Sequence, residues 1–174
     1  LFLKRGTPFL PLIVGGGQER ERRSGTENIA AIVGLATALQ TANDSRYSNS
    51  EHCMSLRDEI IRRVTTDIPS VSLNGGNTNR LPNNVNFAFE GVEGESILLG
   101  LDMAGIAASS GSACSSGSLE PSHVLLALGQ TAELARSSLR ITLGKDNTHE
   151  EIDYLISTLS DLVGNLREFP TMNI

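Results

Sequence analysis

Two kinds of hydrophobic pattern alternate along the chain. In the longer stretches apolar residues recur every three or four positions, which is typical of helices that bury one face. In the shorter stretches apolar and polar residues alternate, which is typical of half-buried strands. The helical spacing predicts helices that open at Thr26, cover 51–67, cover 93–104, start near Pro121 after a Ser118 cap, cover 131–138 and start at Thr148. The alternation predicts strands at 70–74, 84–90 and 139–143. We also expect a short strand at 106–108 and, at 1–5, the end of a strand whose sheet partners lie upstream of this chain.

From residue 70 onward the expected order of elements is β-β-α-β-α-α-β-α. This order predicts an α/β fold in which helices pack on a small mixed sheet. Within the strand at 139–143, Arg140 points away from the face that its apolar neighbours share. A charge in such a position is typical of a solvent-facing side chain, but the planar guanidinium also suits the binding of a carboxylate. Spacing alone leaves both interpretations open.

Composition restricts the class of protein further. The net charge of −6 and the lack of a basic stripe argue against nucleic acid as a partner. No apolar run approaches the roughly 18 residues that span a bilayer, so we expect no membrane association. Cys53 and Cys114 form neither a disulfide framework nor a Cys/His metal pattern, which favours a reducing, cytoplasmic location and no metal site. The chain begins with Leu1 rather than Met, and we therefore expect it to be a piece of a longer protein.

The surroundings of Cys114 are the most informative chemical feature. Residues 105–118 consist of Gly, Ala and Ser apart from Ile106 and Cys114 itself. A structural thiol is normally packed among large apolar side chains, whereas this one lies among small residues and flexible backbone. We interpret Cys114 as a nucleophile on a mobile loop, the alternative being an incidental residue in a Ser/Gly-rich connection. Cys53, on a helical stretch, is interpreted as structural or incidental.

A second polar cluster lies at 15–26. It combines a Gly triplet, three Arg and the sequence Ser24-Gly25-Thr26 at the start of a helix. Helix N-termini bind phosphates through free N–H groups, so this cluster is a candidate anion site. It is neither a Walker motif nor a dinucleotide fingerprint.

Three segments resemble the C-terminal part of cysteine desulfurases, which are pyridoxal-phosphate enzymes of the aspartate-aminotransferase fold. They are Gly-Gly-Gly-Gln-Glu-Arg-Glu-Arg-Arg-Ser-Gly-Thr-Glu-Asn at 15–28, Ser-Ser-Gly-Ser-Ala-Cys-Ser-Ser-Gly-Ser-Leu-Glu-Pro-Ser at 109–122 and Ala-Arg-Ser-Ser-Leu-Arg-Ile-Thr-Leu-Gly at 135–144. The second segment is the most specific of the three. Their order and spacing extend the resemblance along nearly the whole chain.

The resemblance implies a role for each of three residues. Cys114 is similar to the nucleophile that takes sulfur from L-cysteine, which leaves L-alanine and an enzyme persulfide. Arg140 is similar to the residue that holds the substrate carboxylate. Thr26 is similar to a residue that contacts the cofactor phosphate from the neighbouring subunit of a homodimer. For all three residues the resemblance favours a functional role over an incidental one.

The resemblance also implies a domain organisation. Residues 1–26 would be the end of a large domain with the dimer-interface loop, 27–68 the connecting helix or helices, and 69–174 a small C-terminal domain that carries the Cys114 loop. The family holds pyridoxal 5′-phosphate on a lysine as a Schiff base, and neither Lys4 nor Lys145 fits that role. We therefore expect this lysine in an N-terminal part outside the chain, and we expect the chain alone to be inactive.

The partners implied are L-cysteine, the missing N-terminal part, a second subunit, and a sulfur-acceptor or scaffold protein in iron–sulfur cluster or thio-cofactor assembly. Three alternatives stay open. The first is a selenocysteine lyase-type enzyme of the same fold. The second is a non-catalytic sulfur-carrier or interaction module, and the third is an anion-binding domain that uses the 15–26 turn.

Overall fold

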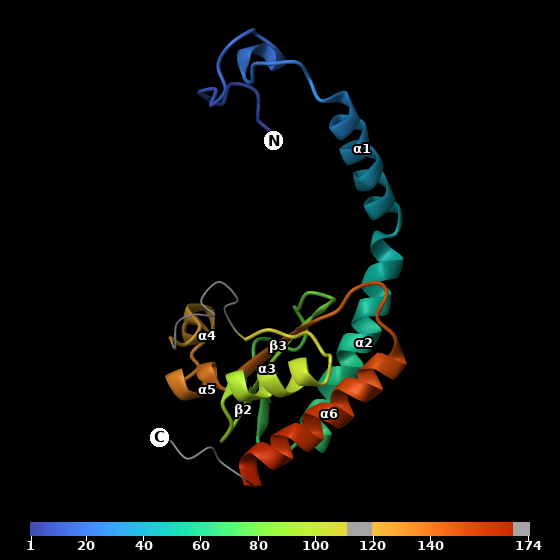
Figure 1. Cartoon of the computed structure of the whole chain (residues 1–174), viewed down its shortest axis with the longest axis vertical. Coiled ribbons are helices and arrows are strands. Elements are labelled where there is room, and N and C mark those ends of the chain that lie inside the picture. The colour runs from blue at the N-terminus through green and yellow to red at the C-terminus, as the bar shows by residue number, and fades with distance from the viewer. Residues whose placement is uncertain (111–119, 169–174) are drawn as a thin grey trace. The chain divides into compact units, whose positions relative to one another are not determined.

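The computed structural model describes residues 1–110 and 120–168 (Figure 1). The chain folds into two compact units, Leu1–Arg46 and Tyr47–Ile174. The boundary between them falls inside the segment 27–68, which the sequence predicts to be the connection between domains.

The first unit contains little regular structure before its one long helix. A single 3-10 turn covers Glu19–Glu21, and α1 covers Ile29–Asp44. The segment 1–5 forms no strand among the described residues, because none of them pairs with it; its expected partners lie outside this chain, so the strand stays a prediction. The helix predicted to open at Thr26 starts later, because Asn28 acts as its N-cap and accepts a hydrogen bond from the N–H of Ala31 at 3.0 Å.

Helix α1 differs from the helices of the second unit in its burial. It contains apolar residues at helical spacing, yet none of its residues is buried in the described structure. Leu35 and Leu39 are 71% and 68% exposed. The following helix, α2 (Arg46–Asp67), is separated from α1 by Ser45, and it buries Leu56, Ile60 and Val64 completely.

The second unit is built on a three-stranded sheet in the order β1-β2-β3. The α/β class is confirmed, but the described strands pair antiparallel throughout rather than forming a mixed sheet. The strand predicted at 106–108 is wrong: only Ser109 pairs, in an isolated bridge with Arg140. The strands are β1 (Val71–Leu73), β2 (Asn84–Phe89) and β3 (Ser138–Thr142).

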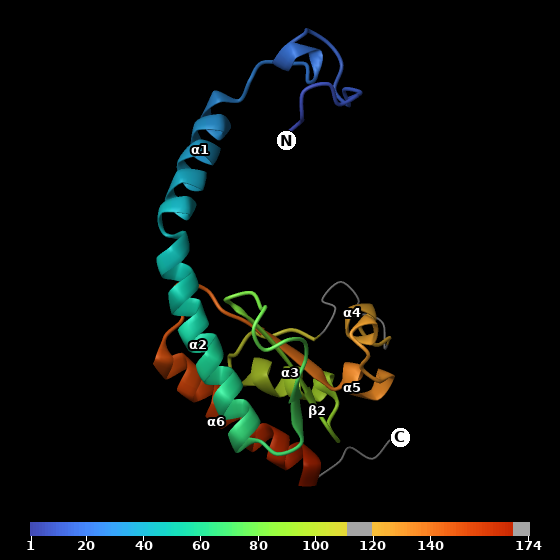
Figure 2. The same ribbon diagram turned by 180° about the vertical axis from the view of Figure 1, so that it is seen from behind.

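The described residues of the second unit form four more helices, all of which follow β2 in the sequence. They are α3 (Gly94–Met103), α4 (His123–Ala127), α5 (Ala132–Arg136) and α6 (His149–Glu168). Ser122 occupies the N-cap position of α4, but its side chain forms no capping hydrogen bond. Ser118, the predicted cap, lies outside the described residues. The apolar faces of α2, α3 and α6 pack with one face of the sheet into a single core (Figure 2).

The N-terminus of α6 is fixed by a reciprocal pair of hydrogen bonds. Thr148 Oγ1 accepts from the N–H of Glu151 at 3.3 Å, and the Glu151 carboxylate accepts from the N–H of Thr148 at 3.1 Å. This capping box satisfies two N–H groups that a helix start otherwise leaves unpaired. The start predicted from Thr148 and the acidic residues after it is therefore confirmed.

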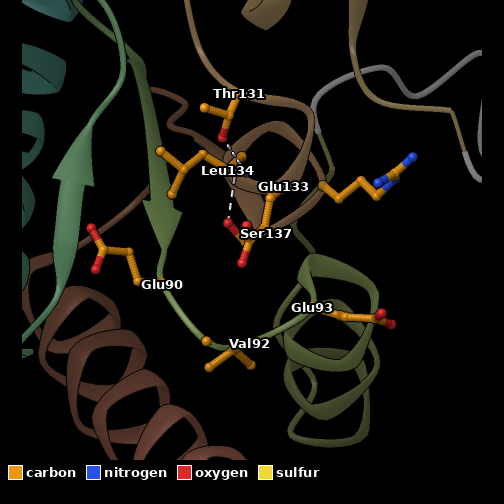
Figure 3. Close-up of a pocket in the computed structure, with 9 residues that line it drawn as sticks. Glu90, Val92, Glu93, Thr131, Glu133, Leu134 and Ser137 are labelled. Atoms are coloured by element: carbon orange, nitrogen blue, oxygen red, sulfur yellow. Dashed lines mark hydrogen bonds between the residues drawn. The ribbon is translucent and has the colours of Figure 1, made fainter. Parts of the chain in front are cut away.

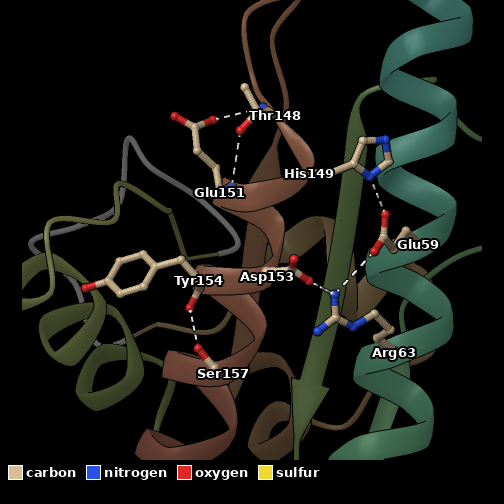
Figure 4. Close-up of polar contacts among 8 residues, drawn as sticks. All are labelled: Glu59, Arg63, Thr148, His149, Glu151, Asp153, Tyr154 and Ser157. Carbon is tan, nitrogen blue, oxygen red and sulfur yellow. Dashed lines mark hydrogen bonds and ion pairs between the residues drawn. The ribbon is translucent and has the colours of Figure 1, made fainter.

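Polar contacts also join α2 to α6 (Figure 4). His149 Nδ1 lies 2.7 Å from Glu59 Oε2, and Arg63 contacts both Glu59 at 3.2 Å and Asp153. The hydrogen bond to Asp153 is the largest cause that raises the pKa of Arg63 above its ordinary value. These groups are largely exposed or half-buried, so each ion pair contributes little to stability. Both helices also contribute apolar side chains to the same core.

Among the helices of the described residues, none combines the length and the apolar composition needed to cross a bilayer.

Candidate functional site

The two faces of the sheet differ sharply in chemistry. Because side chains alternate along a strand, the register places the large apolar residues of all three strands on one face. That face carries Val71, Leu73, Val85, Phe87, Phe89, Leu139 and Ile141. The opposite face carries Ser72, Asn74, Asn84, Asn86, Ala88, Ser138, Arg140 and Thr142. The candidate site lies on this polar face.

Arg140 is the one charged residue of β3, and it is half-buried between buried Leu139 and Ile141. Its side chain points away from theirs, as the alternation predicts. Its Nη2 donates to Ser109 Oγ at 3.2 Å. No acidic side chain in the described part of the chain forms an ion pair with it. A half-buried guanidinium without an acidic partner can bind an anionic ligand.

The backbone of Arg140 holds the start of the segment that leads to Cys114. The N–H of Arg140 donates to the carbonyl of Ser109 at 2.6 Å, and the N–H of Ser109 donates back to Arg140 at 3.1 Å. Cys114 itself lies outside the described residues, as does the predicted mobility of its loop. Five residues of extended chain span at most about 18 Å, so chain length alone keeps Cys114 within that distance of Ser109.

A hydrogen-bonded group of amides and hydroxyls lies next to Arg140 on the same face. Asn74 is 3% exposed and Ser138 is 1% exposed, and their side chains are joined at 3.2 Å. Asn74 Nδ2 also donates to Asn86 Oδ1 at 2.6 Å, and Gln130 Nε2 donates to Asn74 Oδ1 at 2.6 Å. These residues are not among those that the sequence predicts for the site. The sequence feature that points to them is the set of polar residues that alternate with Val85, Phe87 and Phe89 on the strand at 84–90, which indicates that this strand has a polar face.

Thr26 belongs to the first unit and Arg140 to the second, so the structure describes each residue by itself. Thr26 is exposed and precedes the Asn28 cap of α1. Its hydroxyl forms no hydrogen bond among the described contacts, which leaves it free to donate to a phosphate oxygen.

The anion-site interpretation of 15–26 receives little support. The N–H groups of Ser24 and Gly25 already donate to carbonyls, at 3.2 and 3.3 Å. The pocket at the start of α1, of about 270 Å³, is lined by the carboxylates of Glu19 and Glu27 as well as by Arg23. Two carboxylates beside one guanidinium do not favour an anion.

Cys53 and the histidines have structural surroundings. Cys53 is 6% exposed and belongs to the hydrophobic core, so its predicted structural role is confirmed. His52 Nε2 lies 2.8 Å from the carbonyl of Asn147, and His149 contacts Glu59. Each of these two side chains joins α2 to the start of α6. Among the described residues no three His, Cys, Asp or Glu side chains gather as metal ligands would.

A pocket of about 660 Å³ lies between α5 and the turn that leads into α3 (Figure 3). Three acidic residues line it, Glu90, Glu93 and Glu133, together with the basic residue Arg136 and the hydroxyl residues Thr131 and Ser137. The hydroxyl of Ser137 donates to the Leu134 carbonyl at 3.1 Å, within the wall of the pocket. Because three acidic residues outnumber the single basic residue Arg136 in the lining, and because Arg140 does not line it, this pocket does not favour a substrate carboxylate.

The chain is similar in sequence to a known protein family and to individual known proteins. Residues 13–155 match the aminotransferase class-V family. The chain is 49% identical over 170 residues to a cysteine desulfurase IscS of Clostridium botulinum, and the match covers 97% of this chain and 43% of that protein. It is 47% identical over 167 residues to a cysteine desulfurase NifS of Azotobacter vinelandii, covering 96% and 42%.

Solved structures agree with this match. A structure described as a NifS-like protein superimposes with a TM-score of 0.80 at 31% identity, over 95% of this chain and 42% of that one. A NifS-like protein from Rickettsia africae superimposes with a TM-score of 0.74 at 32% identity, over 89% and 40%. The chain thus spans about two fifths of the length of the proteins it matches.

Proposed function

The chain belongs to the aminotransferase class-V family, and from this membership we propose that it is part of a pyridoxal-phosphate-dependent cysteine desulfurase that takes sulfur from L-cysteine. The observation that carries the proposal is the bridge between Ser109 and Arg140. It ties the segment that leads to Cys114 to a half-buried cation without an acidic partner among the described residues. In this proposal Arg140 is the carboxylate-binding group, and the bridge connects it to the segment that leads to the thiol nucleophile, Cys114.

In this proposal Arg140 binds the carboxylate of L-cysteine through paired N–H groups of its guanidinium. Binding at the carboxylate leaves the substrate sulfur free to be approached by Cys114. The Cys114 thiolate forms a bond to that sulfur while the bond from sulfur to Cβ breaks. The electron pair of the broken bond goes to the carbon, which becomes L-alanine after protonation, and Cys114 is left as a persulfide.

The cofactor, when bound, supplies the electron sink that weakens the bond between Cβ and sulfur. Within this chain, the free and exposed hydroxyl of Thr26 fits a phosphate oxygen. Lys145 does not fit the role of cofactor-binding lysine, because its Nζ lies 2.7 and 2.9 Å from the carboxylate oxygens of Asp146 on an exposed turn. We assign the lysine to the part of the whole protein that this chain does not span, and for the same reason the chain by itself is proposed to be inactive.

The wider role is proposed on the same basis. Relatives named IscS and NifS support a sulfur donor for iron–sulfur cluster or thio-cofactor assembly, with a scaffold or acceptor protein that receives the persulfide sulfur. Phosphate contact through Thr26 from a neighbouring subunit requires a homodimer. The two cysteines, which form no disulfide framework in the sequence, support a cytoplasmic location.

The test uses the whole protein, loaded with pyridoxal phosphate and supplied with L-cysteine. We expect L-alanine to form and the mass of the peptide that contains Cys114 to rise by one sulfur atom. Cys114→Ser should abolish both, because a hydroxyl cannot accept the sulfur. Cys53→Ser is the matched control and should keep both, because Cys53 lies in the core of the second unit. Persulfide formation that survives Cys114→Ser would contradict the proposal.

A further inference from the structure

We infer that Asn86 is a second carboxylate-binding residue, whose side-chain amide N–H group lies beside Arg140 and donates to the same substrate carboxylate. The inference rests on the proposed function for the identity of the substrate. Its geometric basis is the register of β2 against β3 and the hydrogen bonds that fix the Asn86 amide.

Asn86 and Arg140 are direct cross-strand neighbours in the register of β2 and β3. Both backbone groups of Arg140 are bonded to Ser109, on the side of β3 away from β2. The carbonyl of Asn86 accepts from the N–H of Asn74 at 2.8 Å, on the side of β2 away from β3. The two residues therefore form a non-hydrogen-bonded pair, for which Cα atoms lie about 4.5 Å apart and the side chains are closest.

Which end of the Asn86 amide faces the cation follows from its neighbours. The Ser138 hydroxyl donates to the carbonyl of Leu134 at 2.8 Å, so its oxygen is left to accept from Asn74 Nδ2 at 3.2 Å. The second hydrogen on Asn74 Nδ2 goes to Asn86 Oδ1 at 2.6 Å. Gln130 Nε2 donates to Asn74 Oδ1, so both the NH₂ group and the oxygen of the Asn74 side chain have hydrogen-bond partners.

This arrangement admits only one orientation of the Asn86 amide. If Asn86 were turned over, its NH₂ group would face the NH₂ group of Asn74, and a buried amide (Asn74) and a half-buried one (Asn86) would each lose a partner. Oδ1 of Asn86 is therefore held toward Asn74, and Nδ2 is left as a donor on the side of the polar face that carries Arg140. Among the described contacts this donor has no acceptor.

A donor beside a guanidinium selects its ligand by chemistry. Two neighbouring groups that only donate hydrogen bonds repel one another weakly and match a ligand that only accepts. A carboxylate has two oxygens with about four lone-pair directions and no donor, so it satisfies both groups at once. A substrate amide in the same place would bring its own NH₂ group against one of the donors. We therefore expect Asn86 to favour a free α-carboxylate over a neutral amide.

The main variant is Asn86→Asp in the whole protein with cofactor. An aspartate keeps the oxygen that accepts from Asn74, so the fold is retained, but it replaces the free donor with a carboxylate beside Arg140. We expect the KM for L-cysteine to rise by about ten- to a hundredfold, with kcat within about twofold. Asn86→Ala should raise the KM by about tenfold through loss of the donor alone. Asn77→Asp, the same change in an exposed turn, should leave the KM within about twofold.

A second measurement separates this inference from the proposed function. Calorimetry follows the binding of L-alanine and of L-alaninamide to the same variants. Asn86→Asp should weaken L-alanine binding by at least about tenfold and leave L-alaninamide binding within about twofold.

Each combination of results has one meaning. If the wild-type protein turns over L-cysteine and Asn86→Asp changes neither KM nor L-alanine binding, the inference is overturned while the proposed function stands. If L-cysteine is not turned over but Asn86→Asp still abolishes L-alanine binding, the proposed function fails and the carboxylate role of Asn86 stands. If the wild-type protein neither turns over L-cysteine nor binds L-alanine, both are overturned. A fall in kcat and thermal stability with an unchanged KM would make Asn86 a structural residue and would also overturn the inference.

Discussion

The two faces of the same three-stranded sheet serve different purposes. One face contributes side chains such as Phe87 and Leu139, which have no exposed surface, to the core beneath α2, α3 and α6. The other face carries amides, hydroxyls and Arg140, whose polar atoms are connected in chains of hydrogen bonds. Because side chains alternate along a strand, a single alternating sequence builds both faces. Substitutions on one face should therefore change stability, and substitutions on the other should change ligand binding.

The largest effect on stability is expected for Phe87→Ala. Phe87 is fully buried and meets Phe89 edge-on with ring centroids 6.2 Å apart. Removing the ring leaves a cavity and should lower the free energy of unfolding by about 3–5 kcal/mol, as measured by urea denaturation. Leu99→Ala, at a position that is 63% exposed, is the control and should cost less than about 1 kcal/mol. Equal losses in the two variants would contradict the assignment of the core face.

A smaller but still structural effect is expected for Asn74→Ala on the polar face. The variant removes a hydrogen-bond partner from each of Ser138, Asn86 and Gln130, and the buried Ser138 hydroxyl keeps only its bond to the Leu134 carbonyl. The free energy of unfolding should fall by about 1–3 kcal/mol, since unpaired buried polar groups are costly. Asn77→Ala in the exposed turn should change it little. A neutral Asn74→Ala would show that the amide network does not hold the polar face in place.

The next smaller effect on stability is expected at α6, one of the helices that pack on the apolar face of the sheet. Thr148→Ala removes the hydroxyl that accepts from the N–H of Glu151 at the start of α6. We expect a loss of about 1 kcal/mol in the free energy of unfolding. Thr78→Ala in an exposed turn is the matched control. A loss no greater than that of the control would mean that packing alone fixes the start of α6.

The smallest expected effect is a pH dependence at the same helix end. Hydrogen bonds from the Asn147 side chain and from the Thr148 N–H hold the pKa of Glu151 below its ordinary value of 4.5. The folded state therefore favours the ionised carboxylate, and its contribution is complete above pH 4.5 and is lost as the pH falls through the lowered pKa. The stability difference between wild type and Glu151→Gln should shrink as the pH is lowered below 4.5. A difference that stays constant across that range would contradict the linkage.

Much of the second unit could be predicted from the sequence. The alternation in 84–90 and 139–143 predicts β2 and β3 within one residue at each end, because each strand buries one face. The stretch at 106–108 lacks such alternation of large and polar residues, and it does not form a strand. The segment at 1–5 was predicted from a few apolar residues, but strand formation depends on pairing, which a local pattern does not specify.

The candidate site could be predicted only in part. The alternation places Arg140 on the face opposite its apolar neighbours, and the structure confirms it. The network of Asn74, Asn86 and Gln130 could not be predicted in the same way, because it joins residues far apart in the sequence through side-chain hydrogen bonds. Those contacts depend on strand register and on the position of the segment before α5, which hydrophobic periodicity does not determine. The roles of Cys114 and Thr26 stay predictions.

The central claim is that the polar face of the sheet binds the substrate carboxylate while Cys114 receives the sulfur. The most direct test measures, in the whole protein with cofactor, the concentration of L-cysteine that gives half-maximal persulfide on Cys114. The comparison is between wild type and Arg140→Gln. The account predicts that this concentration rises by about a hundredfold in the variant, while the unfolding midpoint stays close to that of wild type. An unchanged concentration in a folded Arg140→Gln protein would contradict it.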